Sequence, residues 1–549
     1  MVDTREDETG ISKARRRVLV IGLDGAVPEI LDKLIALGRM PNLAKVYREG
    51  VHGILKSTLP SISSLAWASF ATGNHPGKHG IFGFEGRVEN SYRTRLMYST
   101  DIRTKPLWKM LSEGQKRIVM INVIMSYPPT QVNGVLISGF LAPMETLHHG
   151  FTYPPELAEE LVKQGYKVEP EVLIYQSREK YAQEVFSVME KRAEASLKLL
   201  ETQDWDFFMV LFTEPDRLQH RFWQWMEPER FQVKPGEVRQ YGDVIYQCYE
   251  KADQIIGEFL KRIDDQVTVI FLSDHGFGHA KTNLNLHNWL MQEGLLHLRL
   301  SPTRRFLLAR YRDLTRWMGR MRLMWMVPML RKHLPGGFRK MTSTFKIYDS
   351  IDWTKTKVYS IEKALYINLK GREPNGIVEP GEEYEALRET LIAKLMAIED
   401  PATGEPIVER VFKGEEVYWG PYASKGGDLV VRFRKGYRHW PRLAPGAPII
   451  TPEKVFCSYH HDHEDGFFAV IGPGVKKGAT VDASIVDLAP TIMHLLTVPI
   501  PPDLDGKVLL SLFEEESEPA TRPVYLQEQE DGRARVRERV RRLRAAGRI

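Results

Sequence analysis

Cysteine is almost absent from this chain, and long hydrophobic runs are absent altogether. Only Cys248 and Cys457 occur among 549 residues, which argues against a framework of disulfide bonds and favours a reducing compartment. No stretch reaches the roughly 18 apolar residues of a membrane-spanning helix. The first apolar run, residues 18–21, is too short for a signal segment. From these absences we expect a soluble, cytoplasmic protein.

Excess positive charge is also missing from most of the chain, although the net charge is +5. Residues 301–345 hold eleven Lys and Arg against one Asp, and residues 531–549 hold eight Arg against two acids. These segments carry net charges of +10 and +6, so the remainder carries −11. Because the basic character is confined to two segments, we do not expect nucleic-acid binding by the protein as a whole.

Short apolar runs alternate with helical patterns, and this alternation predicts an α/β fold with a mostly parallel sheet sandwiched by helices. The expected strands cover residues 17–23, 117–123, 134–140, 207–212, 267–272 and 467–471. The expected helices cover residues 28–37, 154–164, 181–202 and 238–263.

Composition suggests a division into units. Residues 14–300 and 454–530 are expected to form the catalytic α/β core, residues 346–453 a smaller accessory α+β unit with a helix over 382–398, and residues 531–549 an Arg-rich tail. Residues 301–345 look like an inserted basic amphipathic helical segment. Such a segment could contact an anionic membrane surface, act as a lid or docking hairpin, or pack as an ordinary helix with a solvated basic face.

An aspartate stands at or just past the end of three expected strands: Asp24, Asp216 and Asp274. Ligands of open α/β sheets bind outside the carboxyl ends of the strands, so we expect the three carboxylates to share one site. Candidate ligands accompany them, and these are His220, His275 and the cluster His460-His461-Asp462-His463.

A hydroxyl-rich loop, residues 57–64, leads into a short apolar helix that is expected to stop at Gly73. The hydroxyls could simply cap this helix, but a helix N-terminus also attracts phosphate. Carboxylates with imidazoles suit zinc or manganese better than calcium or magnesium. Three Asp, three His and a hydroxyl divide into two metal sites, which can clamp the attacking and leaving oxygens of an in-line displacement. The pattern therefore favours phosphoryl transfer to a hydroxyl nucleophile.

Taken in order, these motifs closely resemble the type I phosphodiesterase / nucleotide pyrophosphatase branch of the alkaline phosphatase superfamily. The segments that carry the resemblance are residues 18–25, 66–81, 214–220, 273–276 and 472–474, within a match that spans most of residues 17–510. The resemblance implies an alkaline-phosphatase-like fold and metal-dependent hydrolysis of a small-molecule phosphoester. It also implies two divalent metal ions, zinc or alternatively manganese.

The resemblance further assigns the ligands. One metal would be held by Asp216, His220 and a late histidine, either His463, which we favour, or His461. The other metal would be held by Asp24, Asp274, His275 and the nucleophile.

The nucleophile is placed by the same resemblance. Counting back nine residues from Thr72 gives Ser63, which would form a phosphoseryl intermediate, and the adjacent Ser64 is its rival. Neither cysteine stands at the nucleophile position, which argues against a sulfatase. The nucleotide pyrophosphatases have a phosphate-contacting Asn where this chain has Ala66, so a nucleotide substrate is not implied.

Two alternatives remain open. A phosphomutase or phosphoryl transferase of the same superfamily would carry the same ligands and use an acceptor other than water. A non-catalytic protein associated with a membrane or with nucleic acid would work through residues 301–345 and 531–549. The complete ligand set favours an enzyme over this last reading.

Overall fold

The computed structural model describes residues 4–5, 13–142, 150–171, 177–231, 233–299, 350–440, 447–452 and 463–528, with isolated residues at 310, 313–314, 317–318, 321, 323, 326, 443 and 445. Most of residues 301–345, all of residues 531–549 and His461 lie outside these described residues. Within the described part, no helix is both long enough and apolar enough to cross a membrane.

The centre of the molecule is a parallel block of strands. From one side to the other it contains β11 (Val267–Leu272), β3 (Arg17–Leu23), β10 (Phe207–Phe212), β7 (Ile118–Val123) and β8 (Gly134–Ser138). These strands are buried on both faces, which is why their sequences read as continuous apolar runs. The predicted strands are confirmed, with ends shifted by at most two residues.

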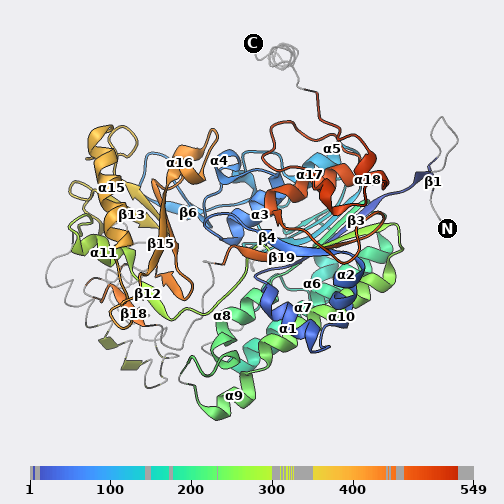
Figure 1. The fold of residues 1–549 in the computed structure, drawn as a ribbon, viewed down its shortest axis with the longest axis horizontal. Coiled ribbons are helices and arrows are strands. Elements are labelled where there is room, and N and C mark those ends of the chain that lie inside the picture. The colour runs from blue at the N-terminus through green and yellow to red at the C-terminus, as the bar shows by residue number, and fades with distance from the viewer. Residues whose placement is uncertain are drawn as a thin grey trace.

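The complete 10-stranded sheet is mixed (Figure 1). Beyond β11 lies β19 (Asp465–Ile471), which runs antiparallel to β11 and to β4 (Val51–Lys56). At the other end β9 (Thr152–Tyr153) pairs antiparallel with β8. Strand β4 escaped prediction because Gly53 interrupts its pattern. A Cβ on Gly53 would lie 2.2 Å from the carbonyl oxygen of Val481, so only glycine fits there.

Alternate residues of each strand face opposite helical layers, as predicted for a sheet covered on both faces. On one face, Leu19 and Ile21 pack with α1 (Pro28–Ala36), α2 (Pro41–Glu49), α7 (Arg178–Thr202), α8 (Glu214–Met226) and α10 (Val244–Arg262). On the other face, Val18 and Val20 pack with α3 (Ser63–Thr72), α5 (Leu107–Glu113) and α17 (Leu488–Leu495). Figure 1 shows the two layers on either side of the sheet.

One helix prediction is wrong in its extent. The helix expected over residues 238–263 is two helices, α9 (Pro235–Tyr241) and α10, separated at Gly242. A Cβ on Gly242 would lie 2.7 Å from the carbonyl oxygen of Val238 and 3.1 Å from that of Trp225. Gly242 has no Cβ to clash with these carbonyls, and the chain turns there before α10 begins at Val244.

A smaller antiparallel sheet lies beside the large one (Figure 1). It is formed in the order β13 (Val358–Ile361), β14 (Ala364–Ile367), β16 (Leu429–Phe433) and β15 (Val408–Lys413), and α15 (Glu382–Met396) packs on it. Leu365, Leu391 and Leu429 belong to its own hydrophobic core. These elements lie in the segment expected to be α+β, while the unit boundaries themselves stay a prediction.

The short apolar helix before Gly73 is α3, and every one of its residues is buried. Gly73 ends it with a φ of 63°, a left-handed conformation that favours glycine. The hydroxyls expected as caps do not serve as such: Ile62 occupies the N-cap position, and no side chain caps the helix. Ser63 is therefore the first residue of an uncapped helix.

Candidate active site

Three neighbouring strands position the expected carboxylates. Asp24 follows β3 directly, Asp274 lies two residues past β11, and Asp216 lies in the first turn of α8, the helix that follows β10. Because β11, β3 and β10 are adjacent and parallel, their carboxyl ends meet at one edge of the sheet. The three side chains are almost fully buried there. The structure thus brings together the three aspartates that the sequence singled out.

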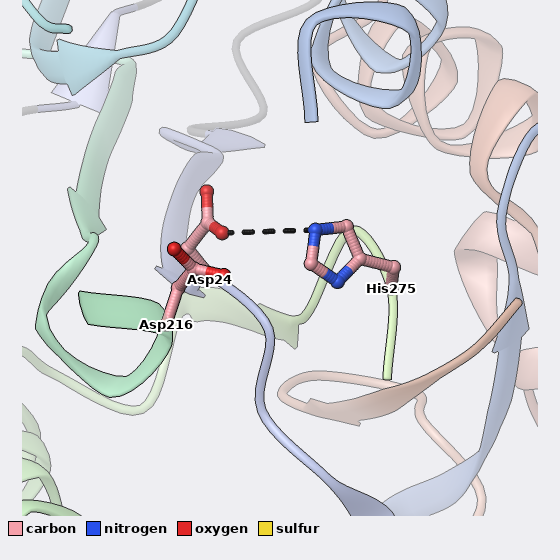
Figure 2. Close-up of side chains that lie close together, drawn as sticks. All are labelled: Asp24, Asp216 and His275. Atoms are coloured by element: carbon pink, nitrogen blue, oxygen red, sulfur yellow. Dashed lines mark ion pairs between the residues drawn. The ribbon is translucent and has the colours of Figure 1, made fainter. Parts of the chain in front are cut away.

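Asp24, Asp216 and His275 form a group that could hold a metal ion. Each offers one ligand atom, and these atoms lie within 4.8 Å of one another (Figure 2). Nε2 of His275 is 3.9 Å from Oδ1 of Asp24 and 3.4 Å from Oδ2 of Asp274. Carboxylate and imidazole groups gathered in this way are typical ligands of zinc.

The ring of His275 is held in one orientation. Its Nδ1 lies 2.8 Å from the carbonyl oxygen of Gly276, so Nδ1 carries the proton and donates it to that carbonyl. The other ring nitrogen, Nε2, faces the carboxylates of Asp24 and Asp274. A backbone carbonyl that fixes the tautomer in this way is typical of metal-ligating histidines.

The buried carboxylates raise one another's pKa values. Burial raises the pKa of Asp24 well above its usual value, and the nearby charges of Asp274 and Asp216 raise it further. Burial also raises the pKa of Asp274 to about 8, although the Gly25 N–H donates to its Oδ1 at 3.2 Å. Oδ2 of Asp274 is buried and accepts no hydrogen bond within the described residues. A divalent cation would neutralise this charge and satisfy this oxygen, so the donor set fits a metal.

Ser63 places a hydroxyl beside this group. Its Oγ lies 3.0 Å from Nε2 of His275, within hydrogen-bond distance. The backbone N–H groups of Ser63 and Ser64 make no hydrogen bond in the described part of the chain, as expected of an uncapped helix N-terminus. They are donors for an anionic oxygen next to the hydroxyl. Oγ of Ser64, by contrast, is buried and has no hydrogen-bond partner among the described residues.

Two other expected histidine ligands, His220 and His463, lie near the group but are not members of it. Nε2 of His220 is 3.4 Å from Oδ1 of Asp216, one turn along α8. The ring of His463 lies directly against Gly278, where a Cβ would come within 2.0 Å of Nε2. Burial lowers the pKa of His463 to about 4, so its ring is neutral, as a metal ligand must be. His461 lies outside the described residues, and the choice between the two stays a prediction.

Sequence reasoning missed Trp67, a support of the site. Its Nε1–H donates to Oδ2 of Asp24 at 3.0 Å. Trp67 follows Ser63 by four residues on α3, a spacing that places both side chains on one helical face. That spacing could have indicated its role.

A second missed support lies behind Asp216. Glu214, two residues earlier, forms an ion pair with Arg192 of α7, and both side chains are inaccessible to solvent or nearly so. Nothing in the sequence links these two positions, because their contact depends on how α7 packs against α8.

The chain resembles known proteins over most of its length. The sequence model of the family described as type I phosphodiesterase / nucleotide pyrophosphatase matches residues 18–439. No curated protein sequence matches the chain. Among solved structures, phosphonoacetate hydrolase from Sinorhizobium meliloti 1021, in complex with phosphonoformate, is 16% identical with a TM-score of 0.53, and the alignment covers 90% of this chain and 98% of that one.

A second solved structure is murine ectonucleotide pyrophosphatase / phosphodiesterase 5, an inactive threonine-to-alanine variant in complex with AMP. It is 13% identical with a TM-score of 0.51, over 91% of this chain and 100% of that one. At such identities the structures show the alkaline-phosphatase-like fold, while the family match extends over well more than half of the sequence. The chain therefore belongs to the type I phosphodiesterase / nucleotide pyrophosphatase family and is a phosphoester hydrolase of the alkaline phosphatase superfamily.

Proposed function

We propose that this protein hydrolyses a small-molecule phosphoester, a phosphodiester or pyrophosphate-like compound, with Ser63 as the nucleophile. The observation that carries the proposal is the 3.0 Å contact between Oγ of Ser63 and Nε2 of His275. It places a hydroxyl at the edge of a buried carboxylate and imidazole group. The hydroxyl of Ser64, the rival candidate for the nucleophile, has no hydrogen-bond partner among the described residues.

Two divalent ions, zinc or alternatively manganese, complete the proposal. Ser63, Asp24, Asp274 and His275 would hold one ion, and Asp216, His220 and His463 would hold the other, with His461 as the alternative to His463. When bound, the ions would lower the pKa of a hydroxyl ligand and neutralise charge on the phosphoryl oxygens.

The residues of the chain have distinct tasks in this reaction. The N–H groups at the start of α3 bind a phosphoryl oxygen and orient the substrate. Ser63 forms a new bond from Oγ to phosphorus while the bond from phosphorus to the leaving oxygen breaks. The product of this step is a phosphoseryl intermediate, and attack by water on its phosphorus restores the Ser63 hydroxyl and releases the phosphoryl product.

Two matched serine variants test this assignment. Ser63→Ala should lower the cleavage of bis(p-nitrophenyl) phosphate by at least about 10³-fold and leave the bound metal, measured by elemental analysis, largely in place. Ser64→Ala removes an equally buried hydroxyl from the next position and should retain activity. Full activity of Ser63→Ala, or its loss in Ser64→Ala alone, would show that the nucleophile is misassigned.

Three earlier expectations stay predictions. They are transfer of the phosphoryl group to an alcohol instead of water, contact of residues 301–345 with an anionic membrane surface, and a cytoplasmic location. Product analysis with and without added alcohols would separate transfer from hydrolysis, because both would pass through the same Ser63 intermediate.

A further inference from the structure

Arg217 follows Asp216 directly in the first turn of α8. Its Nη1 lies 3.6 Å from Oδ2 of Asp216. The other oxygen of that carboxylate, Oδ1, faces His220. The guanidinium group therefore borders the candidate metal group on the side of Asp216 that His220 does not occupy.

Two contacts hold this guanidinium in place. Its Nε donates to Oε2 of Glu169 at 2.8 Å, and its planar group stacks on the ring of Phe140 at 4.7 Å from the ring centre. The ring of Phe140 in turn rests edge-on against Phe84, with the two ring centres 5.4 Å apart. An arginine braced by a carboxylate on one edge and by a ring on one face has lost most of its side-chain freedom. It can bind a ligand without a further entropic cost for ordering.

The edge formed by Nη1 and Nη2 is engaged only by the ion pair of Nη1 with Asp216 at 3.6 Å among the described residues. Nη1 and Nη2 donate no hydrogen bond to any described residue, and the side chain is 23% exposed. A solvated surface arginine would also have unused donors. Arg217 differs because its Nε already donates to Glu169 and one face of its guanidinium group stacks on Phe140. The unused edge presents two parallel N–H groups, the arrangement that binds two oxygens of a phosphate at once.

Arg217 carries a full positive charge, because an arginine side chain stays protonated in proteins. Two carboxylates, those of Glu169 and Asp216, lie beside it. Two bound metal ions would neutralise much of the negative charge of Asp216 and its neighbours. In the metal-loaded protein the free edge of Arg217 would then attract an additional anion rather than the carboxylates already present.

We propose that Arg217 is a substrate-binding residue whose free guanidinium edge contacts the non-bridging oxygens of the phosphoryl group that is transferred. The inference rests on the proposed function, since it requires a phosphoryl group at the Asp24, Asp216 and His275 group. The phosphoryl group would then be bound by a charged donor from α8 as well as by the backbone N–H groups of α3.

The test uses the metal-loaded, full-length protein with inorganic phosphate as the binding probe and bis(p-nitrophenyl) phosphate as the substrate. Arg217→Met should weaken phosphate binding, measured by calorimetry, and lower kcat/KM, each by about 10- to 100-fold, the effect of one lost charged hydrogen-bonding group. Metal content should not change. Arg217→Lys keeps the charge but not the paired donors and should recover only part of the loss.

Arg178 offers a matched control. It also stacks on an aromatic ring, that of Trp225 at 4.9 Å, and pairs with a carboxylate, that of Glu237 at 3.3 Å. It lies on α7, and Trp225 comes nine residues after Asp216 on α8. Arg178→Met should leave phosphate affinity and kcat/KM unchanged.

Two results would overturn the inference. One is wild-type phosphate affinity and kcat/KM in Arg217→Met. The other is a loss of activity that follows a loss of bound metal, because Arg217 would then only orient Asp216. If Ser63→Ala is inactive while Arg217→Met is unaffected, the inference alone fails. If the wild-type protein neither binds phosphate nor cleaves the ester, the proposed function fails with it.

Discussion

Replacing Arg192 by methionine should destabilise the protein far more than the loss of an ordinary salt bridge. Arg192 is completely buried, and its partner Glu214 is 3% exposed. Removing one member of such a pair costs about 3–5 kcal/mol, because the other charge stays buried without compensation. The carbonyl oxygen of Val168 also loses the Nη2 donor at 2.8 Å, worth about 1 kcal/mol. Methionine fills much of the vacated volume, so a cavity adds little. We expect the free energy of unfolding to fall by about 4–6 kcal/mol in total at pH 8.

The stability lost in Arg192→Met should depend on pH, and the titration of Glu214 sets the direction of this dependence. Burial raises the pKa of Glu214, and Arg192 opposes this rise. Without Arg192 the folded-state pKa rises further above the unfolded value. Below the unfolded pKa the carboxyl is neutral in both states and carries no charge penalty. As the pH increases through the folded-state pKa, the penalty develops in full. The variant should therefore lose least stability relative to wild type in mild acid and most above neutrality.

Urea unfolding at pH 5.5 and pH 8 would measure this, with the wild type, Arg192→Met and the double variant Arg192→Met/Glu214→Gln compared. The double variant removes the stranded charge, so it should recover much of the stability lost at pH 8. Arg262→Met serves as control, since Arg262 pairs with Glu201 and Glu258 at the surface and should contribute little. If Arg192→Met resembles Arg262→Met, or if its effect is the same at both pH values, the reasoning is refuted.

Two further changes test the surroundings of the site. Trp67→Phe keeps a ring in place but removes the N–H that donates to Asp24 at 3.0 Å. Metal affinity, measured by competition with a chelating dye, should fall about 10-fold or more, and an unchanged affinity would contradict a supporting role. Burial lowers the pKa of His79 to about 3, so the folded protein binds this proton less readily than the unfolded chain and should lose stability as the pH falls below about 6.5. His79→Gln should flatten this decline in unfolding midpoints between pH 7 and pH 5, and equal slopes in the two proteins would count against it.

The central strands could be predicted because a strand buried on both faces is a continuous apolar run, which can be recognised in each strand separately. β3, β10 and β11 are uninterrupted apolar runs, and each is followed within a few residues by an aspartate. Their adjacency has no local signal, but the rule that ligands gather at strand ends made a shared site the simplest prediction. The antiparallel direction of β19 has no such signature, since a buried strand reads alike in either direction.

The supports of the site were harder to foresee. Glu169 and Phe140 both contact Arg217 but lie 48 and 77 positions before it in the chain. Such pairings follow from the packing of whole elements, and single residues give no pattern for them. The spacing of Ser63 and Trp67 within one helix is the exception, because helical periodicity links them locally.

Asp216 poses a problem that Asp24 and Asp274 do not. Those two extend from paired strands, whereas Asp216 is carried by a helix that could shift relative to the sheet. A chain of neutral hydrogen bonds removes this freedom. Nε2 of Gln219, on α8, donates to the carbonyl oxygen of Gly25 at 2.8 Å, and its Oε1 accepts from the Tyr249 hydroxyl at 2.9 Å.

The same Tyr249 oxygen accepts from the N–H of Val27 at 2.9 Å, so α8, α10 and the loop after β3 are joined at one point. Gly25 permits the approach, because its φ is +65° and a Cβ would stand 3.3 Å from Asp216. None of these bonds involves a charged group or a metal ligand. The spacing of Asp24 and Asp216 is therefore set by the protein before any metal binds, and a cation finds its carboxylates already in position instead of having to draw α8 toward the sheet.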